Sequence, residues 1–321
     1  MLSRETSEPV KVLVKGAGEQ ASATAHRLFQ CGFRVVMTDL ARPTCVRRAV
    51  SFCSALCSQE IDVEGVRGVG YELAQAEVLD EFDWSHIPVF VDPTCRLRAI
   101  WKPEVIIDAR LLKLNLDNAC GDADLVIGLG PGLDAGRDVH YVVETHRGHH
   151  LGRIIARGTA AGNTGRPGEI GGYTHERVLT APRAGVFESQ QAIGHPVRAG
   201  DIIGEVVGEN LSAGTPVGSS TETSAGSSTG TSALDSAWTP AGTSGGIVSG
   251  ISGVITAGIS GVIRGLLVPG SDVVARQKLG DIDPRGDPTF CHTLSDKGRT
   301  ISGSVLEIVV RHVRAKSKPT S

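Results

Sequence analysis

The segment from Lys11 to Asp39 has the pattern of a β-strand, a glycine turn, an α-helix and a second β-strand. The apolar run KVLVK precedes GAGEQA, and small and apolar residues then recur at helical spacing. Gly16, Gly18 and Ala21 occupy the three small-residue positions of the GxGxx(G/A) motif. This arrangement predicts a Rossmann-like α/β domain that begins near residue 10.

The same turn suggests a cofactor site. Gly18 would let a phosphate approach backbone N–H groups at the positive end of a helix. Asp39, which lies roughly 20 residues beyond the glycines, is placed to accept ribose hydroxyls. Glu19 would instead repel a pyrophosphate, so a tight connection without a ligand stays open as the alternative. Arginines after the second strand either select a phosphorylated ribose or stay solvated: Arg42, Arg47 and Arg48.

Further apolar runs alternate with amphipathic stretches as far as residue 130. The runs are FRVVMTD, IPVFVDP, PEVIIDA and ADLVIGLG, rich in Val and Ile. Strands of this kind are typical of a parallel sheet with helices on both faces. We therefore expect one Rossmann-like nucleotide-binding domain over residues 10–130, with polar groups at the carboxyl edge of its sheet.

Residues 131–180 are rich in Gly and His and predict loops folded over a site. The turn that precedes them, with Gly128, Gly130 and Gly132, shapes either a substrate pocket or a tight connection between domains. His146 and His150 would share a helix face if that stretch is helical, which makes them weak metal candidates. The Arg-Gly pair between them indicates a loop, so surface histidines are the favoured interpretation.

Residues 181–283 look like two similar β-rich halves, which predicts a small interlocked β-sandwich. The halves resemble the barrel-sandwich hybrid of biotinyl and lipoyl carrier domains. Those carriers attach their cofactor to a lysine, whereas no lysine occurs from Leu114 to Gln277, so a swinging-arm carrier is excluded. Between the halves, residues 211–258 form a Ser/Thr/Gly-rich insertion that we expect to be disordered.

The C-terminal segment, residues 284–321, carries Cys291 beside His292 and near Arg285 and Lys297. A cysteine among such groups is a candidate thiolate nucleophile, and so a candidate catalytic residue. Neighbouring residues on a strand point to opposite faces, however, so the Cys-His pair need not act together. Burial of Cys291 for structural reasons is the competing interpretation.

The charge balance excludes several classes of partner. The chain has 32 basic and 35 acidic residues, a net charge of -3, so no basic field draws nucleic acid or an anionic membrane. No apolar stretch approaches the roughly 18 residues of a membrane helix, and the first residues lack a signal sequence. Seven cysteines without a repeating CxxC spacing argue against a disulfide framework or a four-cysteine zinc site. We expect a cytoplasmic protein.

Several long motifs resemble one family, the YqeB family of selenium-dependent molybdenum hydroxylase accessory proteins. The motifs are VLVKGAGEQASATAHRL, FRVVMTDLARPTCVRRAV, DLVIGLGPGLDAGRDVHYVVETHRGHHLGRII, NTGRPGEIGGYTHERVL and DPTFCHTLSDKGRTISGSVLE. They cover nearly the whole chain outside the insertion. The GAGEQA turn departs from a GAGD-like turn in relatives.

The resemblance implies a protein that helps mature a molybdenum hydroxylase and that meets the apo-hydroxylase as a partner. Together with the glycine turn and Asp39, the resemblance leads us to expect a bound nucleotide, either NAD(P)-like or the dinucleotide form of the molybdenum cofactor. Two alternatives stay open: an NAD(P)-dependent oxidoreductase acting on a small substrate, and a scaffold that docks the apo-hydroxylase without catalysis.

Overall fold

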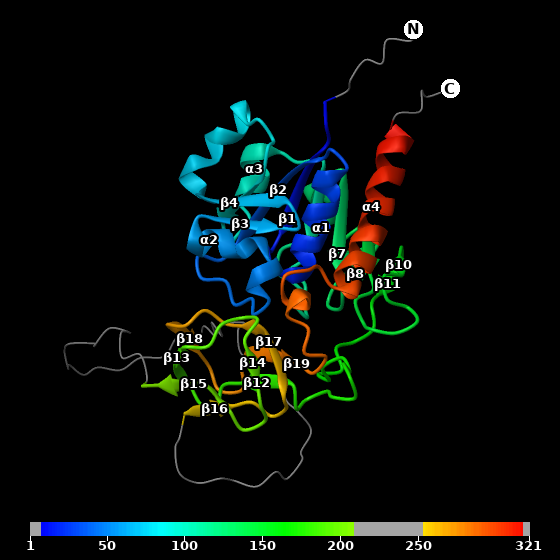
Figure 1. Ribbon diagram of the computed structural model, residues 1–321. Coiled ribbons are helices and arrows are strands. Elements are labelled where there is room, and N and C mark those ends of the chain that lie inside the picture. Colours follow the sequence, from blue (N-terminus) through cyan, green and yellow to red (C-terminus); the bar gives the residue numbers. More distant parts are fainter. Residues whose placement is uncertain (1–7, 209–252, 317–321) are drawn as a thin grey trace, which may run out of the picture.

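The computed structural model describes residues 8–208 and 253–316. It contains one large mixed sheet with helices against it, a two-stranded sheet, and two four-stranded antiparallel sheets that lie together below the large sheet in Figure 1. The expected insertion falls mostly outside the described residues. No helix in the described ranges is long and apolar enough to cross a membrane.

The large sheet has nine strands in the order β10-β9-β7-β6-β1-β2-β5-β4-β3. In chain order they are β1 (Lys11–Lys15), β2 (Arg34–Asp39), β3 (Glu60–Val63), β4 (Val66–Glu72), β5 (Ile87–Val91), β6 (Val105–Asp108), β7 (Leu125–Leu129), β9 (Tyr141–Val143) and β10 (Ile154–Ile155). All pairs from β4 to β9 are parallel, whereas the edge strands β3 and β10 are antiparallel to their neighbours. The prediction of a parallel sheet from the five apolar runs is confirmed.

The sheet continues past residue 130. Strand β9 lies in the region expected to be Gly/His-rich loops, yet it pairs in parallel with β7. Its two valines are fully buried, which explains why a short apolar run between polar residues joins the sheet. Beside it, β8 (Asp134–Ala135) and β11 (Gly158–Thr159) form a separate two-stranded sheet.

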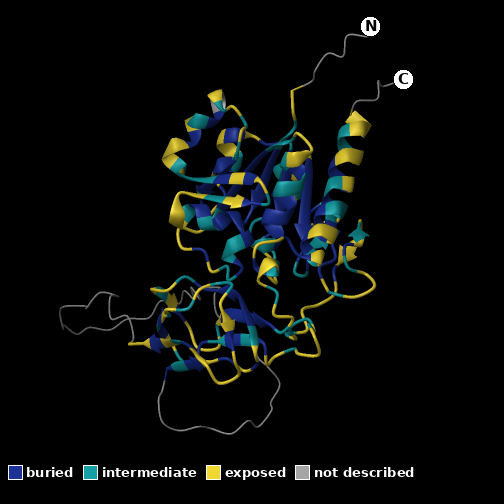
Figure 2. Ribbon diagram, viewed as in Figure 1, coloured by how far each residue is buried: buried dark blue, intermediate teal, exposed yellow. Residues whose placement is uncertain are grey.

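Both faces of the sheet are covered, as Figure 2 shows by the dark interior. Successive residues of β1 point to opposite faces: Val12 and Val14 join one core cluster, and Leu13 joins another. The first cluster lies under α1 (Glu19–Gln30) and α4 (Asp296–Lys316). The second lies under α3 (Leu97–Trp101). The shorter helices are α2 (Ala55–Ser58) and the 3-10 turns η1 (Arg48–Val50), η2 (Phe52–Ser54), η3 (Leu73–Glu81), η4 (Cys120–Asp122) and η5 (Pro288–Cys291).

The long C-terminal helix α4 was not expected from the sequence. It packs beside α1 on the large sheet, although it follows the antiparallel sheets along the chain (Figure 1). Ile301, Val305, Ile308 and Val309 recur at helical spacing and are buried there. Each such side chain contributes roughly 1.5–3 kcal/mol when it is removed from water. The segment after residue 284 therefore completes the first core.

The β-rich region forms two four-stranded antiparallel sheets, β12-β19-β17-β14 and β16-β15-β13-β18. Their strands are β12 (Val178–Thr180), β13 (Gly185–Glu188), β14 (Pro196–Val197), β15 (Ile202–Val207), β16 (Val254–Thr256), β17 (Gly261–Leu266), β18 (Ser271–Val273) and β19 (Lys278–Asp283). The two sequence halves exchange their middle strands: β14 joins β17 and β19, and β18 joins β13 and β15. Residues of both sheets share one core cluster. The name barrel-sandwich hybrid stays a prediction.

One predicted boundary needs correction. The sequence predicts that residues 253–258 belong to the disordered insertion, but Val254–Thr256 forms β16 and pairs with β15. Ile255 and Ala257 are buried in the core of the antiparallel sheets. Burial of these two apolar side chains favours an ordered strand at this position.

Candidate functional site at the glycine turn

The predicted glycine turn lies where β1 ends and α1 begins. Gly16 has φ +91°, and its N–H donates to the Thr38 carbonyl at 2.7 Å. A Cβ at Gly16 would lie 3.2 Å from the Cα of Arg110, so glycine is required both by conformation and by space. Gly18 is the N-cap of α1 and carries no capping side chain, and Ala21 is fully buried inside the helix.

Asp39, the predicted ribose ligand, holds this turn. One carboxylate oxygen accepts the Ala17 N–H at 2.7 Å, and the other accepts the Leu40 N–H at 2.8 Å. Burial raises the pKa of Asp39, and the two backbone hydrogen bonds act against that rise. The structure thus gives Asp39 a role in closing the turn. Its role toward a ribose stays a prediction.

The arginines after β2 lie in different places. Arg42 is exposed, whereas Arg47 is 4% exposed and donates to the carbonyls of Phe290 and Thr293 at 3.1 and 3.4 Å. Arg48 donates to the Leu266 carbonyl at 2.6 Å. Arg47 and Arg48 therefore tie the large sheet to the C-terminal loop and to the antiparallel sheets.

A partly buried charge network beside the turn was missed by the sequence reasoning. Arg110 forms a two-pronged ion pair with Asp108, at 3.0 and 2.6 Å, and also pairs with Asp117. Lys15, which is 2% exposed, donates to Asp117 at 2.8 Å and to Asn118 at 2.9 Å. Burial opposes the charged guanidinium, but the hydrogen bonds from Arg110 to its carboxylates raise its pKa. The available signal was Asp108 at the end of the strand PEVIID, with Arg110 two residues later.

The second predicted turn packs tightly. A Cβ at Gly128 would collide with the Leu133 side chain, and one at Gly130 would lie 2.6 Å from Thr145 Oγ1. A Cβ at Gly132 would collide with the backbone at Lys113. These glycines allow close approach of neighbouring chain segments. Their proposed part in a substrate pocket stays a prediction.

Charged groups on α4 and after β9 face the N-terminus of α1. Arg147 pairs with Asp296, the first residue of α4, at 2.6 Å. Lys297 is half-buried, and its pKa is lowered by burial and then by nearby Arg147. Glu19 exerts a stabilising potential on both of these cations. The negative charge of Glu19 is therefore partly offset.

The histidine region is a loop, as its Arg-Gly pair indicates. His146 and His150 lie in bends and turns, so the shared helix face does not form. The His146 N–H donates to Glu144 at 2.6 Å, and the His150 ring stacks edge-on against His149. Across residues 8–208 and 253–316, no group of three or more potential ligands is placed to hold a metal.

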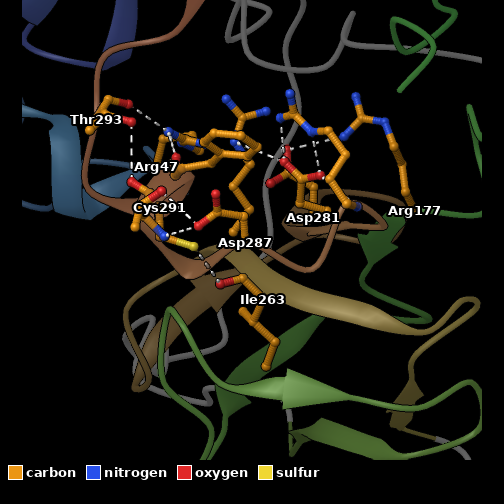
Figure 3. A network of polar contacts seen from close by, with 12 residues as sticks. Arg47, Arg177, Ile263, Asp281, Asp287, Cys291 and Thr293 are labelled. Carbon is orange, nitrogen blue, oxygen red and sulfur yellow. Dashed lines mark hydrogen bonds and ion pairs between the residues drawn. The ribbon is translucent and has the colours of Figure 1, made fainter. Parts of the chain in front are cut away.

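Cys291 is buried in η5, and its thiol donates to the Ile263 carbonyl at 3.6 Å (Figure 3). Burial raises the pKa of Cys291. Arg264 favours the thiolate, but Asp281 and Asp283 act against it. A buried thiol with a raised pKa in a packed position fits the structural interpretation better than the nucleophilic one.

Comparison with known proteins gives one strong relationship. The chain is 37% identical over 309 residues to the uncharacterized protein YqeB of Escherichia coli K12, a match that covers 96% of this chain and 49% of that protein. The chain thus spans about half the length of this relative. No protein-family model matches the chain.

Two solved structures are weakly similar in shape. They are the ectoine utilization protein EutE (DoeB) from Ruegeria pomeroyi, at a TM-score of 0.23, and a succinylglutamate desuccinylase/aspartoacylase from Rhodobacter sphaeroides, at 0.21. Each is 10% identical in sequence and covers 85% of both chains. The family assignment therefore depends on the sequence relationship, and by that relationship the chain belongs to the YqeB family.

Proposed function

We propose that this protein helps mature selenium-dependent molybdenum hydroxylases and binds a nucleotide at the glycine turn. The nucleotide is either free or part of the dinucleotide form of the molybdenum cofactor. The maturation role is supported by the resemblance of several long motifs to accessory proteins of that kind. The binding role is supported by the geometry around Gly16 and Gly18.

The observation that carries the binding role is the reversal of strand order at β1. The chain passes from β1 to β2 and β5 on one side, and later from β6 to β7 and β9 on the other. At such a reversal the connections leave the carboxyl ends of two adjacent strands in opposite directions, and open α/β sheets bind ligands there. Gly16 follows β1 and Arg110 follows β6 at this point. The strand order also supports the Rossmann-like description.

The charges at this edge favour an anionic ligand. The helices α1 and α4 pack together and both begin at this end of the large sheet (Figure 1), so their positive ends face the same region. Arg147 and Lys297 add two cations near Glu19. Gly18 itself places no side chain between a phosphate and the backbone N–H groups of this turn, although the Cys45 sulfur accepts the N–H of Glu19 there.

The maturation role is tested in cells that contain a selenium-dependent molybdenum hydroxylase. Removal of this protein should abolish hydroxylase activity while the amount of hydroxylase protein stays unchanged. Wild-type protein supplied on a plasmid should restore the activity. Unchanged activity after removal would contradict the proposal.

The same cells separate a nucleotide-dependent role from pure docking. The variants Gly18→Asp and Asp39→Ala, each shown to accumulate as folded protein, should fail to restore hydroxylase activity. Full restoration by both variants would support a scaffold that docks the apo-hydroxylase and would contradict the nucleotide part.

A further inference from the structure

Three cysteines line one pocket next to the glycine turn. Cys45 follows β2, Cys53 lies in η2 and Cys57 lies in α2. The pocket has a volume of about 90 Å³. Its lining comprises Pro43, Cys45, Arg48, Cys53, Ser54, Cys57, Ser58 and Val268. Small thiol-reactive groups fit such a space, whereas a whole nucleotide does not.

The Cys45 sulfur has three polar neighbours. It hydrogen-bonds with the Cys53 thiol, lies 3.1 Å from Ser51 Oγ and accepts the backbone N–H of Glu19. A Cβ at Gly18 would lie 3.9 Å from this sulfur. The sulfur therefore lies at the N-terminus of α1, where the helix favours negative charge.

The two hydrogen-bonded thiols differ in acidity. The pKa of Cys45 is lowered, first by the hydrogen bond from Cys53, although burial and the charge of Glu19 act against this. The pKa of Cys53 is raised well above its usual value by that same hydrogen bond and by burial, with Asp39 adding to the rise. Cys45, which is also the more exposed of the two, is thus the nucleophilic member of the pair.

Arg48 provides a cation for all three thiols. Burial lowers the pKa of Arg48, and negative charge on Cys45, Cys57 or Cys53 would raise it. Its Nε is fixed by the Leu266 carbonyl, so the guanidinium is held in the pocket lining. A cation next to a thiol stabilises the thiolate form.

The three cysteines of the pocket differ in solvent exposure. Cys57 is exposed, Cys45 is partly buried and Cys53 is buried. A disulfide entering from solvent would reach the Cys45 sulfur before that of Cys53. All seven cysteines of the chain are free thiols in the structure.

We propose that Cys45 and Cys53 form a thiol–disulfide exchange site, with Cys45 as the attacking thiol and Cys53 as the resolving thiol. The substrate class is a small or exposed disulfide, RS–SR, whose sulfur atoms enter the pocket while the rest stays outside. The Cys45 sulfur shares the N-terminus of α1 with the proposed nucleotide site, but the exchange reaction does not depend on nucleotide binding.

The exchange proceeds in two balanced steps. The Cys45 thiolate attacks one sulfur of RS–SR, a Cys45–SR mixed disulfide forms, and RS⁻ leaves and takes a proton from solvent. Cys53 then loses its proton to solvent and attacks the Cys45 sulfur, which releases the second RS⁻. The dithiol is oxidised to a disulfide, and RS–SR is reduced to two thiols.

The experiment treats the full-length protein with oxidised glutathione, blocks the remaining thiols and maps disulfides by mass spectrometry. Trypsin cuts after Arg47 and Arg48, so a Cys45–Cys53 disulfide joins two separate peptides. A second protease that cuts after Leu56 separates Cys53 from Cys57 and so distinguishes the two possible links. We expect loss of two hydrogens and a Cys45–Cys53 link. A link from Cys45 to Cys57, or no link in the folded protein, would overturn the proposal.

Matched variants identify the order of attack. Cys53→Ser should trap one glutathione on Cys45, Cys45→Ser should abolish both the trapped adduct and the link, and Cys57→Ser should leave the link intact. Glutathione that accumulates on Cys53 in Cys45→Ser as fast as on Cys45 in Cys53→Ser would show that the assigned order is wrong. Nucleotide titrations on the same variants keep this result distinct from the proposed function.

Discussion

The carboxylate of Asp39 accepts a hydrogen bond from the backbone N–H of Ala17 at 2.7 Å, across 22 positions of the chain. This contact joins the end of β2 to the glycine turn after β1. Because α1 begins at this glycine turn, the Asp39 carboxylate fixes the direction in which the first N–H groups of that helix point. The geometry of the proposed nucleotide site therefore depends on a residue of the neighbouring strand.

We predict that Asp39→Ala lowers the free energy of unfolding by about 1–3 kcal/mol, because it leaves the partly buried Ala17 N–H without its acceptor. Urea unfolding measures the change. Asp62→Ala is the matched control, since Asp62 accepts the Gly65 N–H at 2.9 Å in an exposed turn. Equal losses of unfolding free energy in the two variants would contradict a special role of Asp39 in stabilising the glycine turn.

Gly16→Ala should cost more stability than Gly32→Ala. Both glycines have positive φ, +91° and +84°, so both substitutions carry about 1 kcal/mol or more of backbone strain. A Cβ at Gly16 also meets the backbone of Arg110, whereas one at Gly32 meets nothing within 4 Å. Thermal unfolding of the two variants compares them directly. A larger loss for Gly32→Ala would contradict the close approach of Arg110.

The pair of Arg147 and Asp296 predicts a specific acid response. The hydrogen bond from Arg147 lowers the pKa of Asp296 from 3.8 to about 2. Because the folded-state pKa is the lower one, the pair stabilises the protein fully above the unfolded-state pKa, and this contribution is lost as the pH falls from about 4 towards 2. The Asp296 side chain is 72% exposed and that of Arg147 is 36% exposed, so solvent screens the pair and its contribution is at most about 1 kcal/mol.

Asp296→Asn should therefore reduce stability at pH 7 by that small amount and by almost nothing at pH 2. Denaturant unfolding of wild type and variant across this range gives the difference. A difference that grows as the pH falls would contradict the assignment of the pair.

Cys291 should react slowly in the folded protein. Its thiol is buried and its pKa is raised, so alkylating reagents should modify the exposed Cys31 and Cys57 first and Cys291 only on unfolding. Peptide mapping after timed labelling measures this order. Rapid labelling of Cys291, together with loss of hydroxylase maturation in Cys291→Ser, would support Cys291 as a nucleophile.

The sequence predicts local patterns well. The glycine turn, the five apolar strands and the similarity of the two β-rich halves all depend on spacing that is visible along the chain. Helix α4 has such a signal too, in Ile301, Val305 and Ile308, but its place beside α1 depends on contacts across the whole chain. Packing between segments that lie far apart in the sequence cannot be predicted from local periodicity.

The site was only partly accessible to sequence reasoning. Asp39 could be singled out by its distance from the glycines, but its bond to Ala17 depends on the register of β1 and β2. The Cys45–Cys53 pair has no CxxC spacing and is brought together by the turns between β2 and α2. The cysteine that was singled out, Cys291, has charged neighbours along the chain, yet in the folded chain its sulfur faces a carbonyl.

The central claim is that an anionic nucleotide binds at the glycine turn, and calorimetry with Gly18→Asp tests it most directly. Gly18 has φ -72° and room for a side chain, so an aspartate there should cap α1 and leave the fold intact, while its charge should repel a phosphate. NAD, NADP, ATP and cytidine nucleotides would be titrated into wild type and variant. We predict that at least one binds the wild type and that the folded variant does not bind it. No binding of any of them to the wild type, or equal binding to both proteins, would contradict the claim.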